Sequence, residues 1–121
     1  MVLHRGLSKM SVAFKDEKLD QASTGSYASI LKAKTDGLHA SIVIANLSAA
    51  QILHWKVLGS NDPEGAAGTF AEEKAEADLA VSTLAAYLTV NRYLWTDVQI
   101  QEGSGGGSPH ASCWLLGIGH P

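Results

Sequence analysis

The side chains that could bind a metal or attack a substrate are few in this chain of 121 residues. The nitrogen and sulfur groups belong to His4, His39, His54, His110, His120 and Cys113. The histidines show neither the i, i+4 spacing nor the clustering that is typical of a metal site. Cys113 lies in no catalytic-thiol motif, and its apolar segment is typical of a small buried residue. We therefore predict no catalytic residue, no cofactor and no enzyme activity, and we interpret the histidines as solvent-facing strand residues.

The segment Ser60-Asn-Asp-Pro-Glu64 brings several oxygen ligands together in one loop. Calcium is bound by many oxygens, often from loops of this kind. The segment lacks the regular carboxylate spacing of a dedicated calcium loop. A turn in which Asn61 and Asp62 bond their own backbone explains the same residues equally well. We therefore predict no metal site here.

The run Gly103-Ser-Gly-Gly-Gly-Ser108 could cradle a phosphate or serve as a linker. It lacks the Lys-Ser/Thr of a P-loop and the helix that would follow it. The segment 111–118 is rich in β-forming residues, which argues against a linker to an unrelated peptide. We expect the glycine run to be the loop of a hairpin that joins a strand at 97–101 to a last strand at 111–118.

Composition limits the classes of partner. The formal net charge is −3, so we predict no binding to nucleic acid, which needs a basic patch. No stretch of ~18 uninterrupted apolar residues predicts a membrane span, and the first residues do not resemble a secretory signal. With one cysteine, no disulfide can form within the chain. Charged residues make up only 17 %, which favours either a surface partly covered by a partner or a small domain rich in uncharged residues.

The hydrophobic pattern predicts short antiparallel strands rather than helices. In the segment 97–101, Val98 and Ile100 point to one face and Gln99 and Gln101 to the other, because strand side chains alternate. The expected strands are 27–34, 38–47, 51–58, 84–90, 92–96, 97–101 and 111–118. Asp36-Gly37 indicates a tight turn between the first two of them. We predict an all-β fold, one small β-sandwich of about seven or eight strands over residues 26–121, with an extended N-terminal arm over residues 1–25.

The segment 69–81 is ambiguous. Its alanines, glutamates and lysine are good helix formers. Strand alternation also fits, because Ala75, Ala77, Leu79 and Val81 lie on one face and mostly charged residues on the other. The neighbouring segments favour strands, and sheet context often overrides a weak propensity. We favour a strand and keep the helix as the alternative.

The last expected strand is apolar on both faces. Ala111, Cys113 and Leu115 share one face, and Trp114, Leu116 and Ile118 share the other. A terminal strand that is buried on one side only should carry polar residues on its second face. We infer that this strand either lies inside the sheet or is covered by another molecule.

Four elements follow one another along the chain: the segment Trp55-Lys-Val-Leu-Gly-Ser-Asn-Asp-Pro63, a charged strand, the segment Asp97-Val-Gln-Ile-Gln-Glu-Gly-Ser-Gly-Gly105 and a final apolar strand. Together they resemble small β-sandwich structural proteins of tailed phages. The resemblance covers about residues 38–118 and rests on turns and alternation, not on a catalytic motif. It implies a virion component such as a capsid cement (decoration) protein or a head–tail or tail accessory protein. It also implies a location in the virion, after assembly in the host cytoplasm.

Two functions follow. The first is a cement protein that binds the major capsid protein or another virion protein and forms homo-oligomers, with no nucleic acid or membrane partner. Its expected partner-binding residues are apolar and lie in the arm and the last strand: Val2, Leu3, Leu7, Val12, Phe14, Trp114, Leu116 and Ile118. The alternative is a carbohydrate-binding module in which Tyr87, Tyr93 and Trp95 stack on sugar rings.

Overall fold

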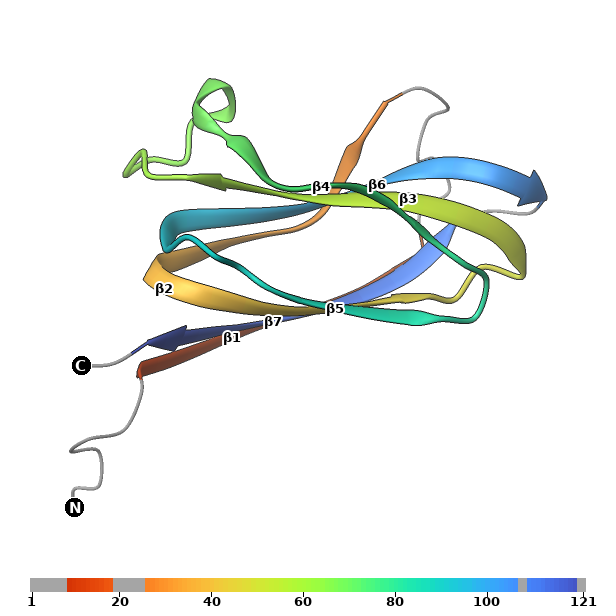
Figure 1. Cartoon of the computed structure of the whole chain (residues 1–121), viewed down its shortest axis with the longest axis horizontal. Coiled ribbons are helices and arrows are strands. Elements are labelled where there is room, and N and C mark those ends of the chain that lie inside the picture. The colour runs from red at the N-terminus through yellow and green to blue at the C-terminus, as the bar shows by residue number, and fades with distance from the viewer. Residues whose placement is uncertain (1–8, 19–25, 107–108, 120–121) are drawn as a thin grey trace, which may run out of the picture.

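The computed structural model describes residues 9–18, 26–106 and 109–119, and for residues 9–18 and Gly119 it describes the backbone alone. These residues form seven strands and one short 3-10 turn, Ala67–Thr69, with no α-helix (Figure 1). The strands are β1 (Lys9–Lys18), β2 (Ala28–Asn46), β3 (Ala50–Ser60), β4 (Ala71–Leu79), β5 (Leu84–Leu88), β6 (Tyr93–Gly106) and β7 (His110–Gly119). All pairs are antiparallel, so the predicted fold class is confirmed.

The strands form one curled sheet that faces itself as two layers (Figure 1). We call the layer β1-β7-β2-β5 sheet A and the layer β2-β6-β3-β4 sheet B. Strand β2 belongs to both layers. Its residues 28–38 pair with β6, and its residues 39–46 pair with β7, and in part with β5 on the other side. The result is a small sandwich whose two layers share one long strand.

Part of the segment expected as an arm forms β1, the outermost strand of sheet A. It pairs with β7 along its whole length, from Lys9 opposite Gly119 to Lys18 opposite His110. Residues 19–25 lie outside the described residues. The division of the chain into an arm over residues 1–25 and a sandwich over residues 26–121 stays a prediction.

The tight turn predicted at Asp36-Gly37 is wrong, because the chain continues through it as a single strand. Asp36 and Gly37 have the positive φ values of 52° and 79° that such a turn would need. Here they form an irregularity in β2, where the register with β6 shifts between Lys34 and Leu38. The buried Thr35 anchors this bend by donating a hydrogen bond from Oγ1 to the Tyr93 carbonyl at 2.8 Å. The bend moves β2 from one layer to the other, as a bulge re-aims a strand.

The predicted hairpin after residue 101 is also wrong. Strand β6 continues through Gly106, and it pairs with β2 and β3 but not with β7 in the described part of the chain. The glycines are required by close backbone contacts. A Cβ at Gly105 would lie 2.1 Å from the Ala50 carbonyl oxygen, and one at Gly103 would lie 2.4 Å from that of Ile52. The chain then crosses from sheet B to sheet A instead of folding back beside β6.

The ambiguous segment is a strand over Ala71–Leu79, as favoured from its sequence context. It forms the edge of sheet B, where Leu79 is buried opposite Leu53. Charges protect such an edge from pairing with other chains, which explains the glutamates and Asp78. Lys74 departs from the simple alternation and places its Nζ 4.2 Å from the ring centre of Trp55.

The core lies between the two sheets. Its fully buried side chains come from β2, β3, β6 and β7 and include Ile30, Ile42, Ile44, Leu53, Val57, Val98, Ile100 and Leu115. Trp55 is 2 % exposed and joins the same cluster. Because β2 contributes isoleucines to both halves of this cluster, the bend at Asp36-Gly37 determines how the layers face each other.

Candidate functional site

Sheet A carries apolar side chains on the side that faces away from the core. Residues opposite each other in an antiparallel ladder lie on the same face of the sheet. Val43 of β2 lies between Trp114 of β7 and Ala86 of β5. We call the following set the outer apolar face: Leu84, Ala86 and Leu88 of β5, Val43 of β2, and Trp114, Leu116 and Ile118 of β7.

Several members of the outer apolar face are exposed to an unusual degree for large apolar side chains. Leu84 is 70 % exposed, Leu88 58 % and Trp114 41 %. The alternate residues of β7 are in the core, where Cys113 is 0 % and Leu115 1 % exposed. The two-sided apolar pattern of the last strand therefore has a simple cause: one side packs inside, and the other forms the surface of sheet A. Contiguous exposed apolar surface of this kind marks interaction sites.

The backbone register brings part of β1 to the same face. Val12 is opposite Leu116, and Phe14 is opposite Trp114. Five of the eight residues expected to bind a partner therefore occupy neighbouring positions on sheet A: Val12, Phe14, Trp114, Leu116 and Ile118. The other three, Val2, Leu3 and Leu7, lie outside the described residues. That these residues bind a partner stays a prediction.

Sequence reasoning missed the contribution of β5. The sequence places Leu84 and Leu88 in an expected strand but does not connect them with a surface. The available signal was the alternation of Leu84, Ala86 and Leu88 with Ala85 and Tyr87, which puts both leucines on one side. Only the pairing of β5 with β2, known from the structure, tells which side is the core.

A hydrogen-bond network on Glu73 holds the loop that follows β5. Oε2 of Glu73 accepts from the Tyr87 hydroxyl at 2.6 Å and from the Val90 amide at 2.8 Å. Its Oε1 accepts from the Asn91 side-chain amide at 3.0 Å. Burial tends to raise the pKa of the Glu73 carboxyl, but these hydrogen bonds outweigh it and hold the pKa below the ordinary value of 4.5. Burial and the hydrogen bond to Glu73 raise the pKa of Tyr87 to about 12. The network thus connects β4 of sheet B with β5 of sheet A.

We expect Glu73→Gln to destabilise the protein at pH 7 by about 1–3 kcal/mol, because an amide cannot accept from all of these donors. A lowered carboxyl pKa contributes stability above its unfolded value and loses it as pH falls through the folded pKa. The difference between wild type and variant should therefore shrink below pH 4.5, the ordinary glutamate value. Urea unfolding of wild type and variant, at pH 7 and again below pH 4.5, measures this difference in stability. Glu72→Gln, at an exposed position of β4, is the control, and an equal effect there would contradict the role of the network.

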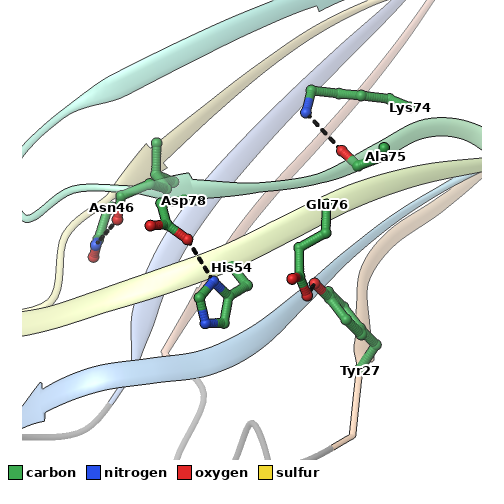
Figure 2. A network of polar contacts seen from close by, with 8 residues as sticks. Tyr27, Asn46, His54, Lys74, Ala75, Glu76 and Asp78 are labelled. Atoms are coloured by element: carbon green, nitrogen blue, oxygen red, sulfur yellow. Dashed lines mark hydrogen bonds and ion pairs between the residues drawn. The ribbon is translucent and has the colours of Figure 1, made fainter.

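Sheet B has a polar outer side with a second network (Figure 2). His54 of β3 contacts Asp78 of β4, with 2.7 Å between Nδ1 and Oδ1. Tyr27 donates from its hydroxyl to Glu76. Lys56 places its Nζ 4.1 Å from the ring centre of Tyr27. His54 and Asp78 are directly opposite each other on neighbouring strands and form a cross-strand pair. Tyr27, which precedes β2, instead reaches side chains of β3 and β4, strands that do not pair with β2. Among the described residues no group of three or more His, Cys, Asp and Glu side chains could hold a metal ion.

The three aromatic residues considered for sugar binding come from two strands, Tyr87 from β5 and both Tyr93 and Trp95 from β6. Tyr87 and Tyr93 lie near Asn91, which bonds Glu73 together with Tyr87 and approaches the Tyr93 hydroxyl at 3.5 Å. Trp95 belongs to sheet B and donates from Nε1 to the Pro63 carbonyl at 3.2 Å. Tyr93 belongs to β6 as Trp95 does, two residues away on the same face of the strand. The carbohydrate-binding alternative stays an untested prediction.

The oxygen-rich loop uses its carboxylate on its own backbone. Asp62 accepts from the Glu64 amide at 3.1 Å and from the Ala66 amide at 3.0 Å. Gly65 has a φ of 63°, and its backbone packs under the Trp95 ring. The Asp62 contacts are those of an Asx-type turn, as the second interpretation expects. Asn61 differs from that interpretation, because its Oδ1 accepts from the Leu94 amide of β6 at 3.2 Å instead of from the loop's own backbone.

Cys113 is buried in the core, and burial raises the pKa of its thiol to about 12. The reactive form of a cysteine is the thiolate, so we expect the native protein to be inert towards an aromatic disulfide reagent at pH 8. Labelling should follow global unfolding and become rapid in denaturing urea. The measurement is the labelling rate against urea concentration. Rapid labelling of the native chain would contradict the buried position.

No protein-family model matches this chain, and no curated protein sequence matches it. Solved structures with a similar fold include the following three. A chain from "Bacillus endospore appendages form a novel family of disulfide-linked pili" has a TM-score of 0.58 and 13 % identity, and the match covers 98 % of this chain and 94 % of that one. A chain from "Crystal structure of PirA" has a TM-score of 0.51 and 12 % identity, with 96 % of each chain covered.

The third similar chain is from "Structure of infectious bursal disease virus Gx strain", with a TM-score of 0.50 and 16 % identity. The match covers 93 % of this chain but only 32 % of that one, so the present chain spans about a third of it. At these identities the likenesses show the fold alone. No helix among the described residues is long and apolar enough to cross a membrane.

Proposed function

We propose that this protein is a non-enzymatic structural protein of a virion, a capsid cement or decoration protein. It binds the major capsid protein and braces the lattice by burying the outer apolar face of sheet A. The observation that carries the proposal is that face itself, with Leu84, Leu88 and Trp114 all more than a third exposed. Fold likeness to a chain of a pilus structure and to a chain of a virus structure supports an assembled, structural role.

The physical basis is apolar burial. Each Å² of apolar surface removed from water contributes roughly 25 cal/mol, and a standard interface removes about 1,600 Å² in total. Most of this gross stabilisation is offset by the lost freedom of the partners. The attachment uses no disulfide, because the one cysteine of the chain, Cys113, is buried in the core.

The test is co-sedimentation of the full chain with particles assembled from the major capsid protein of the same virus. We expect Trp114→Lys to weaken binding by more than about tenfold, because a charge in the centre of the face must be desolvated. Gln101→Lys, on the outer side of sheet B, is the matched control and should bind as wild type does. Equal binding of all three proteins would refute the proposal that this face binds the capsid.

The expected arm contacts need a separate test. A triple variant carries Val2→Ser, Leu3→Ser and Leu7→Ser. All three positions precede β1, so the sequence of β1 is unchanged. We expect weaker co-sedimentation than with wild type. Unchanged affinity would remove these three residues from the site while leaving the outer apolar face in place.

A second candidate is a subunit of a surface appendage, favoured by the nearly full-length fold likeness to the endospore appendage chain. It predicts that the purified chain forms filaments by itself, without a capsid. Negative-stain electron microscopy of the concentrated chain distinguishes the two, because a decoration protein forms no filament.

A further inference from the structure

Strand β5 is an edge strand without the protection that the other edges have. The edges of the two sheets are β1, β5 and β4. The sequence of β1 is KMSVAFKDEK and that of β4 is AEEKAEADL, whereas β5 reads LAAYL and has no charge. Within the described residues β5 pairs with β2 alone. An exposed, uncharged edge is a template for pairing with another strand.

The hydrogen bonds to β2 determine which backbone groups of β5 are available. The Thr89 amide donates to the Ala40 carbonyl at 2.9 Å, and the Asn46 amide donates to the Thr83 carbonyl at 3.0 Å. Bonded positions alternate in an antiparallel pair, so residues 85 and 87, in phase with 83 and 89, also bond to β2. The N–H and C=O groups of Leu84, Ala86 and Leu88 therefore point to the open edge.

We propose that two copies of this chain form a two-fold symmetric dimer by pairing their β5 strands antiparallel, centred on Ala86. Ala86 then lies opposite Ala86 of the second copy, and Leu84 lies opposite Leu88 of the second copy. All of these are hydrogen-bonded positions, because each uses the outward-pointing groups of both strands. Antiparallel pairing of a strand with itself requires a two-fold axis, which closes the assembly at two copies.

The side chains fit this register. The most exposed leucines, Leu84 at 70 % and Leu88 at 58 %, come to lie opposite each other on the outer side of sheet A. No charge of one β5 meets a charge of the other. The outer apolar face also becomes continuous across the two copies, which doubles its extent. The dimer does not depend on capsid binding, since it uses the edge of the sheet rather than the centre of its face.

The first test is analytical ultracentrifugation of the full chain by itself, with two matched double variants. Leu84→Lys with Leu88→Lys places like charges opposite each other in the dimer, and Leu84→Lys with Leu88→Glu places opposite charges there. We expect wild type to show a monomer–dimer equilibrium. The first variant should raise the dissociation constant more than about tenfold, and the second should stay within about tenfold of wild type. Thermal melts verify that both variants fold, because both positions are exposed.

The second test is cross-linking with introduced cysteines. Opposed residues at a hydrogen-bonded pair have Cα atoms about 5.5 Å apart, within disulfide range, so Ala86→Cys should give a covalent dimer on mild oxidation. Leu84→Cys is the control, because the two copies of residue 84 are four positions out of register, which displaces them from each other by about 13 Å along the strand axis. Oxidation of the wild-type chain in parallel shows whether Cys113 itself forms any cross-link.

Four results would overturn the dimer. One is a wild-type chain that is still monomeric at about 1 mM, a concentration at which even a very weak complex is half formed. Another is an equal rise of the dimer dissociation constant in the two double variants, or no rise in either. The third is cross-linking of Leu84→Cys as fast as Ala86→Cys. Larger oligomers that persist in the like-charge variant would show pairing through other edges and would also refute the proposal.

Discussion

Ile42→Ala is expected to lower the free energy of unfolding by about 2–5 kcal/mol, the range for truncating a large buried aliphatic side chain. Ile42 is 0 % exposed and lies in the half of β2 that belongs to sheet A. Its ladder partners are Leu115 of β7 and Tyr87 of β5. Because β2 is fixed by strands on both sides, the backbone cannot move inward to fill the space. The cost should therefore be in the upper half of that range.

A graded series separates the cavity from other effects. Ile42→Val removes one methyl group and should cost about 0.5–1.5 kcal/mol. Val43→Ala is the matched control, because its side chain is half-buried on the other side of the same strand. It should cost less than about 2 kcal/mol. Urea unfolding followed by tryptophan fluorescence measures all three. A cost for Ile42→Ala no larger than that for Val43→Ala would contradict the position of the core.

The features that sequence predicted correctly are those set by local alternation. The opposite orientation of Cys113 and Trp114 follows from the two-residue period of a strand, whatever its neighbours are. Residues 71–79 form a strand despite their helix propensity, because the chain around them has strand neighbours to pair with. Each of these follows from the pleat or from the immediate sequence context.

The features that sequence missed are those set by non-local pairing. Asp36-Gly37 has the backbone of a tight turn but forms a bend, because β6 pairs with the chain before it and β7 with the chain after it. The glycines of β6 resemble a loop, yet Gly103 and Gly105 are needed because the β3 backbone comes close to them. Leu84 and Leu88 could be assigned to a surface only once the partner of β5 was known. Local sequence does not contain these pairings.

Asn46→Ala is expected to cost about 3 kcal/mol or more, which is unusual for a single polar residue. Asn46 is 0 % exposed and stands at the end of β2, close to the last residues of β4 (Figure 2). Its Nδ2 donates to the Gln51 carbonyl at 2.7 Å and to the Leu79 carbonyl at 2.9 Å. Its Oδ1 accepts from the Ser48 amide at 2.9 Å. One side chain therefore binds β2, β3 and β4 together where the two layers meet.

Asn46→Asp tests this role by a change of pH. The introduced carboxyl can still accept from the Ser48 amide, but when ionised it faces two carbonyl oxygens in a buried position. Burial and these oxygens raise its folded pKa above the unfolded value of about 3.9. A raised folded pKa means that stability is present below the unfolded value and is lost as pH rises through the folded one. Below about pH 4 the neutral acid can donate one hydrogen bond, so its deficit relative to wild type should shrink there. The deficit of Asn46→Ala should not change with pH. Urea titrations of both variants and wild type, at pH 7 and at low pH, measure the two deficits. A deficit for Asn46→Asp that is independent of pH would show that Asn46 does not hold the layers through its amide donor.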